Sequence, residues 1–158
     1  MPLAEGTELP THTYRVTRAD LVRYAGASGD RNPIHWSDRV ATSVGLPGVI
    51  AHGMYTLALA ARAVDAWAGA PGRVRELGAK FTRPVVVPDD DEGAEVTVAG
   101  TVKKVEDTGA GSLVTVAMTV TSGDDKVLGA PTARFLAGPE SGAEPGAESG
   151  AESGDRVG

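Results

Sequence analysis

The sequence contains no cysteine. This absence excludes disulfide bonds, thiolate nucleophiles and metal sites built from cysteine ligands. The sequence also lacks an apolar run long enough to cross a bilayer, and its opening residues, MPLAEGTELP, lack the charged-then-apolar pattern of a secretory signal. We therefore expect a cytoplasmic protein that does not enter a membrane.

Positive charge is also scarce, because 15 basic residues stand against 21 acidic ones and give a formal net charge of −6. This balance argues against nucleic acid as a partner. The length of 158 residues suits one domain with its own core. Residues 138–158 form an acidic Gly/Ala/Glu/Ser-rich repeat that cannot bury enough apolar surface to fold. We expect one domain over residues 1–137 and a disordered tail over residues 138–158.

The first half of the sequence looks helical and rich in loops. Residues 12–17 alternate as in a strand, and Thr17 is placed to cap a helix over residues 18–27. Gly29 and Pro33 then break the helical pattern. The segment from residue 52 to 67 is also helical, and its first three turns are apolar all round, which predicts burial on every side.

The second half looks like strands separated by acidic or Gly-rich turns. Alternation places Val114, Val116, Met118 and Val120 on one face of a strand, and Gly100 is a plausible bulge. Helices followed by strands indicate an α+β fold with an antiparallel sheet. One apolar helix beside one long meander indicates a sheet wrapped around that helix, although the pattern leaves the strand order open. The predicted strands cover residues 74–87, 95–105, 112–120 and 126–136.

Two motifs carry a resemblance to a known family. The stretch YAGASGDRNPIHWSD, which begins at Tyr24, resembles the hydratase motif of the MaoC-like dehydratase family, and IAHGM, which begins at Ile50, resembles its second signature. The resemblance runs from about Thr11 to Leu136. Within the family, these motifs are most similar to the catalytic B subunits of actinobacterial (3R)-hydroxyacyl-ACP dehydratases. The resemblance implies a single hotdog fold and the conversion of 3-hydroxyacyl-ACP to trans-2-enoyl-ACP in type II fatty acid synthesis.

Dehydration of a 3-hydroxyacyl thioester removes a proton from C2 and expels the hydroxyl from C3. One group that both takes and gives a proton near neutral pH suits this reaction, and histidine matches it best. We assign this work to His35. Asp30 can orient the imidazole or share the water that leaves, and it can equally cap the turn at the helix break.

The thioester oxygen gains negative charge during this reaction and has to be stabilised. Gly53 lies in the first turn of the apolar helix, where backbone N–H groups lack helical partners and the helix dipole favours an anion. The resemblance implies that the N–H of Gly53 forms the oxyanion hole. We expect Asn32 to tie the loop together, and His52 either to orient the helix start or simply to pack there.

A metal site built from Asp30, His35 and His52 is an alternative, because zinc accepts two imidazoles and a carboxylate. The resemblance implies neither a metal nor another cofactor. In some CoA-dependent hydratases of this family a serine joins the site two turns beyond the glycine, and this sequence has Ala61 there. The substrate pocket is therefore expected to be less polar on that side. The sequence alone assigns no functional role to Trp36 or Trp67.

The resemblance also implies partners. We expect an acyl thioester carried by acyl carrier protein, or by CoA, and a heterodimer with a related hotdog subunit that lacks the catalytic pair, with a homodimer as the alternative. Two other functions remain open, an (R)-specific enoyl-CoA hydratase and a non-catalytic acyl-binding subunit; the presence of both Asp30 and His35 counts against the second. Candidates for a basic patch that meets the acidic carrier are Arg73, Arg75, Lys80, Arg83, Lys103 and Lys104.

Overall fold

The computed structural model describes residues 3–109 and 111–137. The tail predicted to be disordered, residues 138–158, lies outside the described residues. In chain order the elements are β1 (Glu8–Val16), α1 (Arg18–Ser28), the short 3-10 helix η1 (Pro33–His35), α2 (Asp38–Ser43), α3 (Gly53–Ala68), β2 (Val74–Phe81), β3 (Ala94–Asp107), β4 (Ser112–Ser122), β5 (Asp125–Lys126) and β6 (Leu128–Ala137).

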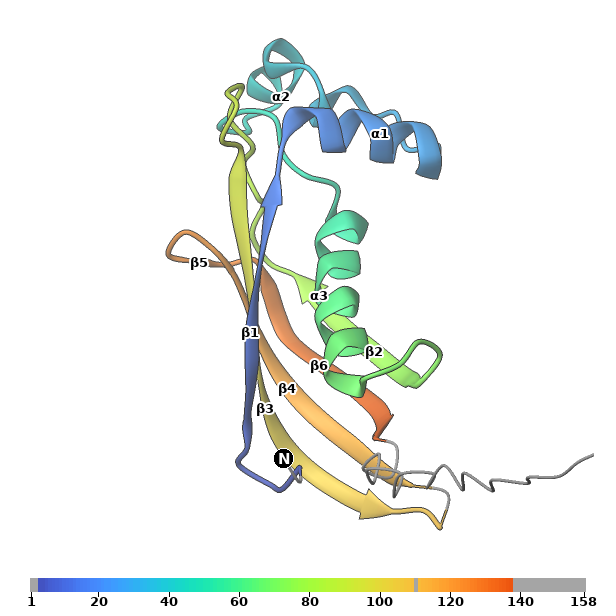
Figure 1. Ribbon diagram of the computed structural model, residues 1–158. Helices are drawn as coiled ribbons and strands as arrows, with labels where there is room; N and C mark the ends of the chain where they lie inside the picture. Colours follow the sequence, from blue (N-terminus) through green and yellow to red (C-terminus); the bar gives the residue numbers. More distant parts are fainter. Residues whose placement is uncertain (1–2, 110, 138–158) are drawn as a thin grey trace, which may run out of the picture.

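The strands form one antiparallel sheet in the order β1-β3-β4-β6-β2, and the short β5 pairs with β4. The sheet curves along the length of α3, while α1 and α2 lie together beyond one end of the strands (Figure 1). This arrangement confirms the predicted α+β class and the antiparallel sheet around a long helix. Because β1 and β2 are the outer strands, each of them has one edge that no other strand of this sheet pairs with.

The core lies between α3 and the concave face of the sheet. Leu59, Ala60, Ala63 and Val64 of α3 are buried, and they recur at the spacing of one helix face. The predicted alternation of β4 is confirmed, because all four of its inward residues are buried. The sheet residues that complete this core are Val96, Val98, Val102, Val114, Val116, Met118, Val120, Ala133 and Phe135.

The prediction that the apolar helix is buried on every side is wrong for the single chain. Met54 of α3 is 58% exposed, and Ala58, Arg62 and Asp65 on the same outer side are exposed as well. A sheet can cover only one face of a helix that packs on it. The outer face of α3 therefore presents apolar and polar side chains to the surroundings.

Gly100 serves a close contact, and the predicted bulge lies elsewhere. A Cβ at Gly100 would lie 2.7 Å from Cη2 of Trp67, so only glycine leaves room for that ring on β3. One irregularity begins at the pair of Leu9 with Gly100, and its extra residue lies in β1, between Leu9 and His12. A second lies in β3 itself, between Val102 and Lys104. Pro10 lies in the first of these, and its carbonyl accepts a hydrogen bond of 2.8 Å from Nε1 of Trp67. The bulge in β1 and the glycine together hold the last turn of α3 against the sheet.

The helices α1 and α2 form a cap that polar contacts tie to the connector before α3. Thr17 and Asp20 form a capping box at the start of α1, as the predicted cap at Thr17 requires. Asp38 at the start of α2 accepts two hydrogen bonds from Arg18, at 2.9 and 3.0 Å, and a third from the N–H of Val49 at 3.0 Å. These bonds hold the pKa of Asp38 below its usual value, the Val49 N–H having the largest effect. The cap is thus fixed to the connector that leads into α3.

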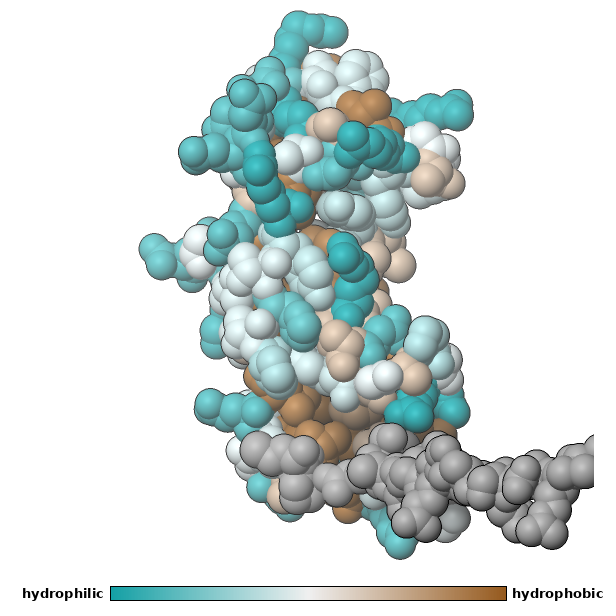
Figure 2. All heavy atoms as spheres, viewed as in Figure 1, coloured by the Kyte–Doolittle hydropathy of each residue, from teal (hydrophilic) through white to brown (hydrophobic). Residues whose placement is uncertain are grey.

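Among the described residues, no helix has both the length and the apolar character needed to cross a membrane. Apolar surface nevertheless remains on the outside of the molecule, and in the view of Figure 2 most of it lies in the lower half, beside α3 and the strands. Val22, Trp36, Met54 and Phe81 are among the large apolar side chains that are more than half exposed.

Gly100→Ala should destabilise the protein by about 1–3 kcal/mol, because the added methyl group overpacks the contact with Trp67. Gly78→Ala in β2 is the matched control, because the nearest atom to its added Cβ is Oγ1 of Thr132, at 4.0 Å. Chemical denaturation of both variants measures the effect. Equal stability of the two variants would contradict the packing role of Gly100.

Candidate active site

The loop between α1 and α2 is shaped by two consecutive side-chain turns. Helix α1 ends at Gly29, whose φ of 79° lies in the left-handed region that glycine favours. Oδ1 of Asp30 then accepts a hydrogen bond of 3.2 Å from the N–H of Asn32, and Oδ1 of Asn32 accepts one of 3.3 Å from the N–H of Ile34. Pro33 begins η1. Asp30 thus caps the turn with one oxygen and keeps Oδ2 for another partner.

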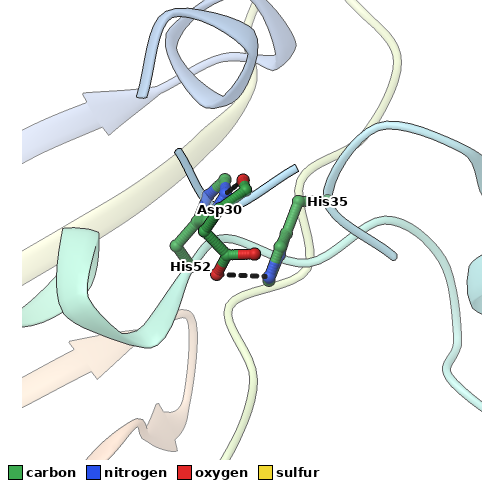
Figure 3. Close-up of side chains that lie close together, drawn as sticks. All are labelled: Asp30, His35 and His52. Atoms are coloured by element: carbon green, nitrogen blue, oxygen red, sulfur yellow. Dashed lines mark hydrogen bonds and ion pairs between the residues drawn. The ribbon is translucent and has the colours of Figure 1, made fainter. Parts of the chain in front are cut away.

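His35 is held in a single orientation by the connector before α3. Its side chain is almost fully buried, and Nδ1 lies 2.7 Å from the carbonyl oxygen of Ile50. A carbonyl oxygen only accepts hydrogen bonds, so Nδ1 of the neutral ring carries the proton and Nε2 carries the lone pair. Nε2 faces Oδ2 of Asp30 at 3.9 Å (Figure 3). The site therefore presents a base nitrogen and a carboxylate oxygen to the same point.

His52 lies directly behind this pair. Its ring stacks on His35 with centroids 3.7 Å apart, and its Nε2 donates a hydrogen bond of 3.0 Å to the carbonyl oxygen of Asp30. The ring of Tyr24, from α1, also packs against the ring of His52, with the two centroids 4.8 Å apart. Nδ1 of His52 is buried and has no hydrogen-bond partner among the described residues. His52 thus contacts both Asp30 and His35. The sequence alone had left open whether His52 orients the helix start or simply packs there.

Gly53 is the first residue of α3, and His52 is the N-cap residue without a side-chain cap bond. The N–H groups of this turn have no partners within the helix. Phe81, the last residue of β2, stands over this glycine: a Cβ there would lie 3.1 Å from Cδ1 and Cε1 of the ring. Phe81 is itself 56% exposed. The helix start is therefore covered by a side chain that has room to move outward.

His35 and Gly53 line one cavity of about 350 Å³. Thr56 reaches it from the next turn of α3, while Phe81 and Arg83 reach it from the end of β2 and beyond. Ala61 does not line it, and Ala60 and Ala63 pack into the core instead. Ala60 and Ala63 therefore face the sheet and not this cavity. The other lining residues are Ile50, Ala51, Thr82, Pro84, Val85, Val127 and Leu128.

Burial lowers the pKa of His35 below its ordinary value of 6.5, because the protonated ring loses its hydration. The hydrogen bond to Ile50 opposes this effect, and so does the negative charge of Asp30. A charge on the stacked His52 lowers the pKa of His35 further. His35 is therefore neutral at pH 7, with the lone pair of Nε2 ready to accept a proton.

The three residues of the alternative metal site do lie together, because ligand atoms of Asp30, His35 and His52 fall within 4.8 Å of one another. The two imidazoles are stacked with only 22° between their planes, so their lone pairs do not converge on one point. Nδ1 of His35 and Nε2 of His52 are also both used as donors to carbonyl groups. This geometry does not favour a metal ion, and its absence from the working site stays a prediction.

The structure brings all five predicted site residues, Asp30, Asn32, His35, His52 and Gly53, to one end of α3. Sequence reasoning missed the carbonyl of Ile50, which fixes the tautomer of His35, and it missed Thr56 and Phe81. The IAHGM motif contains Ile50, but a backbone carbonyl leaves no trace in residue type. Phe81 was placed correctly in a strand, and only the fold brings that strand end to Gly53.

Comparison with known proteins finds a matching family and related sequences. The chain matches the MaoC like domain over residues 3–123. It is 40% identical to 3-hydroxyacyl-thioester dehydratase X of Mycobacterium tuberculosis over 79 residues, which cover 50% of this chain and 27% of that protein. It is 41% identical to fatty acid synthase subunit beta of Aspergillus oryzae over 73 residues, 45% of this chain and 4% of that protein. The chain thus matches about a quarter or less of the length of these curated relatives.

Solved structures resemble the chain as well. A MaoC-like dehydratase superposes with a TM-score of 0.79 at 39% identity, over 85% of this chain and 40% of that chain. The R-hydratase PhaJ1 from Pseudomonas aeruginosa gives a TM-score of 0.73 at 28% identity, over 87% of this chain and 84% of that chain. The hotdog fold that the motifs implied is confirmed.

The imidazole of His35 should titrate below pH 6.5 in NMR spectra of the labelled protein. Asp30→Asn removes a negative charge that favours protonation, so it should lower this pKa further. His52→Phe keeps a stacked ring but removes the electrostatic effect by which His52 lowers the pKa of His35, so it should raise that pKa relative to the unmutated chain. A His35 pKa above 6.5 in the unmutated chain would contradict the argument from burial.

Proposed function

The chain belongs to the MaoC-like domain family, and from that premise and the geometry of the site we propose that it is a (3R)-hydroxyacyl thioester dehydratase. The substrate is 3-hydroxyacyl-ACP and the product is trans-2-enoyl-ACP, in type II fatty acid synthesis. One observation carries the proposal: Nε2 of His35 and Oδ2 of Asp30 face each other across 3.9 Å at the N-terminus of α3.

The first step is removal of a proton from C2. The lone pair of His35 Nε2 takes this proton, and the electrons of the C2–H bond move toward the thioester carbonyl, whose oxygen gains negative charge. The N–H of Gly53 donates to that oxygen, and the dipole of α3 stabilises it further. For the thioester to reach this N–H, Phe81 has to move outward, since its ring lies against Gly53.

The second step breaks the bond between C3 and its hydroxyl oxygen. The proton held by His35 passes to that oxygen, the C2=C3 double bond forms, and water leaves. The distance of 3.9 Å between Nε2 and Oδ2 is too long for a direct hydrogen bond, but an oxygen placed about 2.8 Å from each atom fits between them. Asp30 and His35 therefore hold the departing oxygen together, and the carboxylate stabilises the imidazolium that forms in between.

Two relatives support the choice of reaction and of pathway. One is named a 3-hydroxyacyl-thioester dehydratase and the other a fatty acid synthase subunit. The reaction is reversible, so the same residues in the opposite direction would make the chain an (R)-specific enoyl-CoA hydratase. This second candidate is favoured by the similarity to the R-hydratase PhaJ1, which extends over most of both chains. Cytoplasmic location stays a prediction of the sequence.

A second hotdog subunit is the proposed protein partner, in a heterodimer or a homodimer. The outer face of α3 is open in the single chain, with Met54 largely exposed, and β2 is an edge strand whose outer side pairs with no other strand of the described residues. Phe81 ends that strand and also covers the site. An interface along β2 and α3 would bury this apolar surface and bring the second subunit next to the cavity.

The proposed function is tested by assaying dehydration and hydration of one acyl chain, carried on ACP and on CoA. Faster dehydration of the ACP thioester is expected. His35→Ala and Asp30→Asn should each lower turnover by about 10²-fold or more, because proton transfer loses its positioned group. His12→Ala is the matched control, since this third histidine lies on β1, stacked on Tyr14 away from the cavity. A His35→Ala protein with normal turnover would refute the mechanism.

Gly53→Ala should lower kcat strongly while leaving the melting temperature nearly unchanged, because the added methyl group obstructs the thioester oxygen at the N–H. The same methyl group also meets the ring of Phe81 at 3.1 Å, so a second cause of lost activity has to be separated. Phe81→Leu removes that ring contact.

The double variant Gly53→Ala/Phe81→Leu distinguishes the two causes. If the methyl group obstructs the oxyanion, the double variant stays as slow as Gly53→Ala. Recovery of kcat in the double variant would show that Gly53 exists to accommodate Phe81, and the oxyanion donor would have to lie elsewhere.

A further inference from the structure

An exposed apolar groove lies on the outer side of the cap. Its volume is about 530 Å³, and it is lined by Val22, Ala25 and Gly26 of α1 and by Arg31 and Trp36 of the loop that follows. Val22 is 60% exposed and Trp36 is 53% exposed, although both are large apolar side chains. Nε1 of Trp36 donates a hydrogen bond of 3.1 Å to the carbonyl of Arg31, so the indole is held in place across the groove.

The charge around the groove differs from that of the whole chain. Residues 17–46 contain four arginines and three aspartates, a balance of +1, whereas the full sequence has −6. Arg18 pairs with Asp38 and Arg23 pairs with Asp20. Arg31, which lines the groove, makes no ion pair with any residue in the described part of the chain. An apolar floor with an uncompensated guanidinium suits a partner that offers an apolar side chain next to a carboxylate.

The groove is next to the catalytic residues in sequence and in space. Arg31 follows Asp30 and Trp36 follows His35, so the same loop carries the proposed reacting pair and two of the residues that line the groove. The carboxylate of Asp30 is 55% exposed, which leaves an open route from the outside to the pair. A carrier bound in the groove could therefore pass a long flexible thioester arm around the loop to the cavity.

We propose that this groove docks an acidic, amphipathic helix of the acyl carrier protein. The inference rests on the proposed function and adds the surface that recognises the carrier. An apolar residue of the helix fills the space between Val22 and Trp36, and an acidic residue beside it pairs with Arg31. Groove recognition of this kind is a common mode of helix binding, and tryptophan and arginine are the side chains most often decisive at such interfaces.

Two alternatives account less well for the same surface. The nucleotide of CoA carries several phosphate charges, whereas a single arginine lines this groove and the rest of the lining is apolar or glycine. The basic residues of the strands are dispersed: Lys104 pairs with Glu106 and Arg83 pairs with Asp125. The cap combines an apolar floor, an available cation and proximity to the catalytic loop.

The test compares one acyl chain on three carriers: ACP, CoA and N-acetylcysteamine. Val22→Glu and Arg31→Glu should each lower kcat/KM for the ACP thioester by about tenfold and leave kcat/KM for the two small thioesters unchanged. Val44→Glu is the matched control, because Val44 is 63% exposed on the same cap and does not line the groove. Equal losses on all three carriers, a loss on CoA comparable to that on ACP, or no loss on ACP would each overturn the proposal.

A binding measurement separates this proposal from the proposed function. The sequence has two tryptophans, so Trp67→Phe leaves Trp36 as the single indole reporter. Titration with ACP that carries no acyl group should change the emission of Trp36 saturably, and Arg31→Glu should abolish the change. If the chain binds ACP in this way but turns over no thioester, the proposed function fails and the docking surface stands. If it dehydrates acyl-ACP without any change at Trp36, the docking surface fails and the function stands.

Discussion

The contact between His35 and Ile50 is the interaction on which the site depends. The backbone of Ile50 is used twice: its N–H donates to the carbonyl of Ile34 at 3.2 Å, and its carbonyl accepts the proton of His35 Nδ1 at 2.7 Å. The connector on either side is bonded to the segment after β2, through Ala51 to Val85 and Val87 to Val49. The segment after β2 thus fixes the connector, and the connector fixes the imidazole. One backbone carbonyl thereby determines which nitrogen of His35 is the base.

The environment of that imidazole balances opposing effects. Burial disfavours the protonated ring, which keeps the lone pair of His35 free at neutral pH, while Asp30 favours the protonated ring, which in the proposed mechanism helps once the proton has been taken. His52 stacks behind His35 and holds the backbone of Asp30, so the two groups keep their separation without touching. In the proposed mechanism, a direct hydrogen bond between Asp30 and His35 would occupy the place of the departing oxygen. The gap of 3.9 Å would then be the space for that oxygen, maintained by bonds made elsewhere in the loop.

Much of the fold could be predicted because its signals are local. Alternation along β4 reports which side chains face the helix, and Thr17 reports a helix start through its own hydrogen bond. The interpretation of Gly100 was wrong because a glycine needed for a close contact and a glycine needed for a bulge look alike in sequence. Only the position of Trp67, 33 residues further back along the chain, decides between them. The exposure of the outer face of α3 in the single chain was also not predicted. An apolar helix face has the same sequence pattern whether its own sheet or another subunit would cover it.

The candidate site shows the same division between local and distant information. Asp30, Asn32 and His35 lie in one stretch of six residues, and the turns that join them could be anticipated from asparagine and aspartate chemistry. The tautomer of His35 and the cover over Gly53 could not, because they depend on a backbone carbonyl and on the end of a strand from another part of the chain. Helix α3 explains why these distant parts meet. Its inner face packs on the sheet, its N-terminus carries the N–H group proposed to bind the thioester oxygen, and its outer face is the surface proposed to meet a second subunit. In that proposal one element joins the core, the chemistry and the assembly.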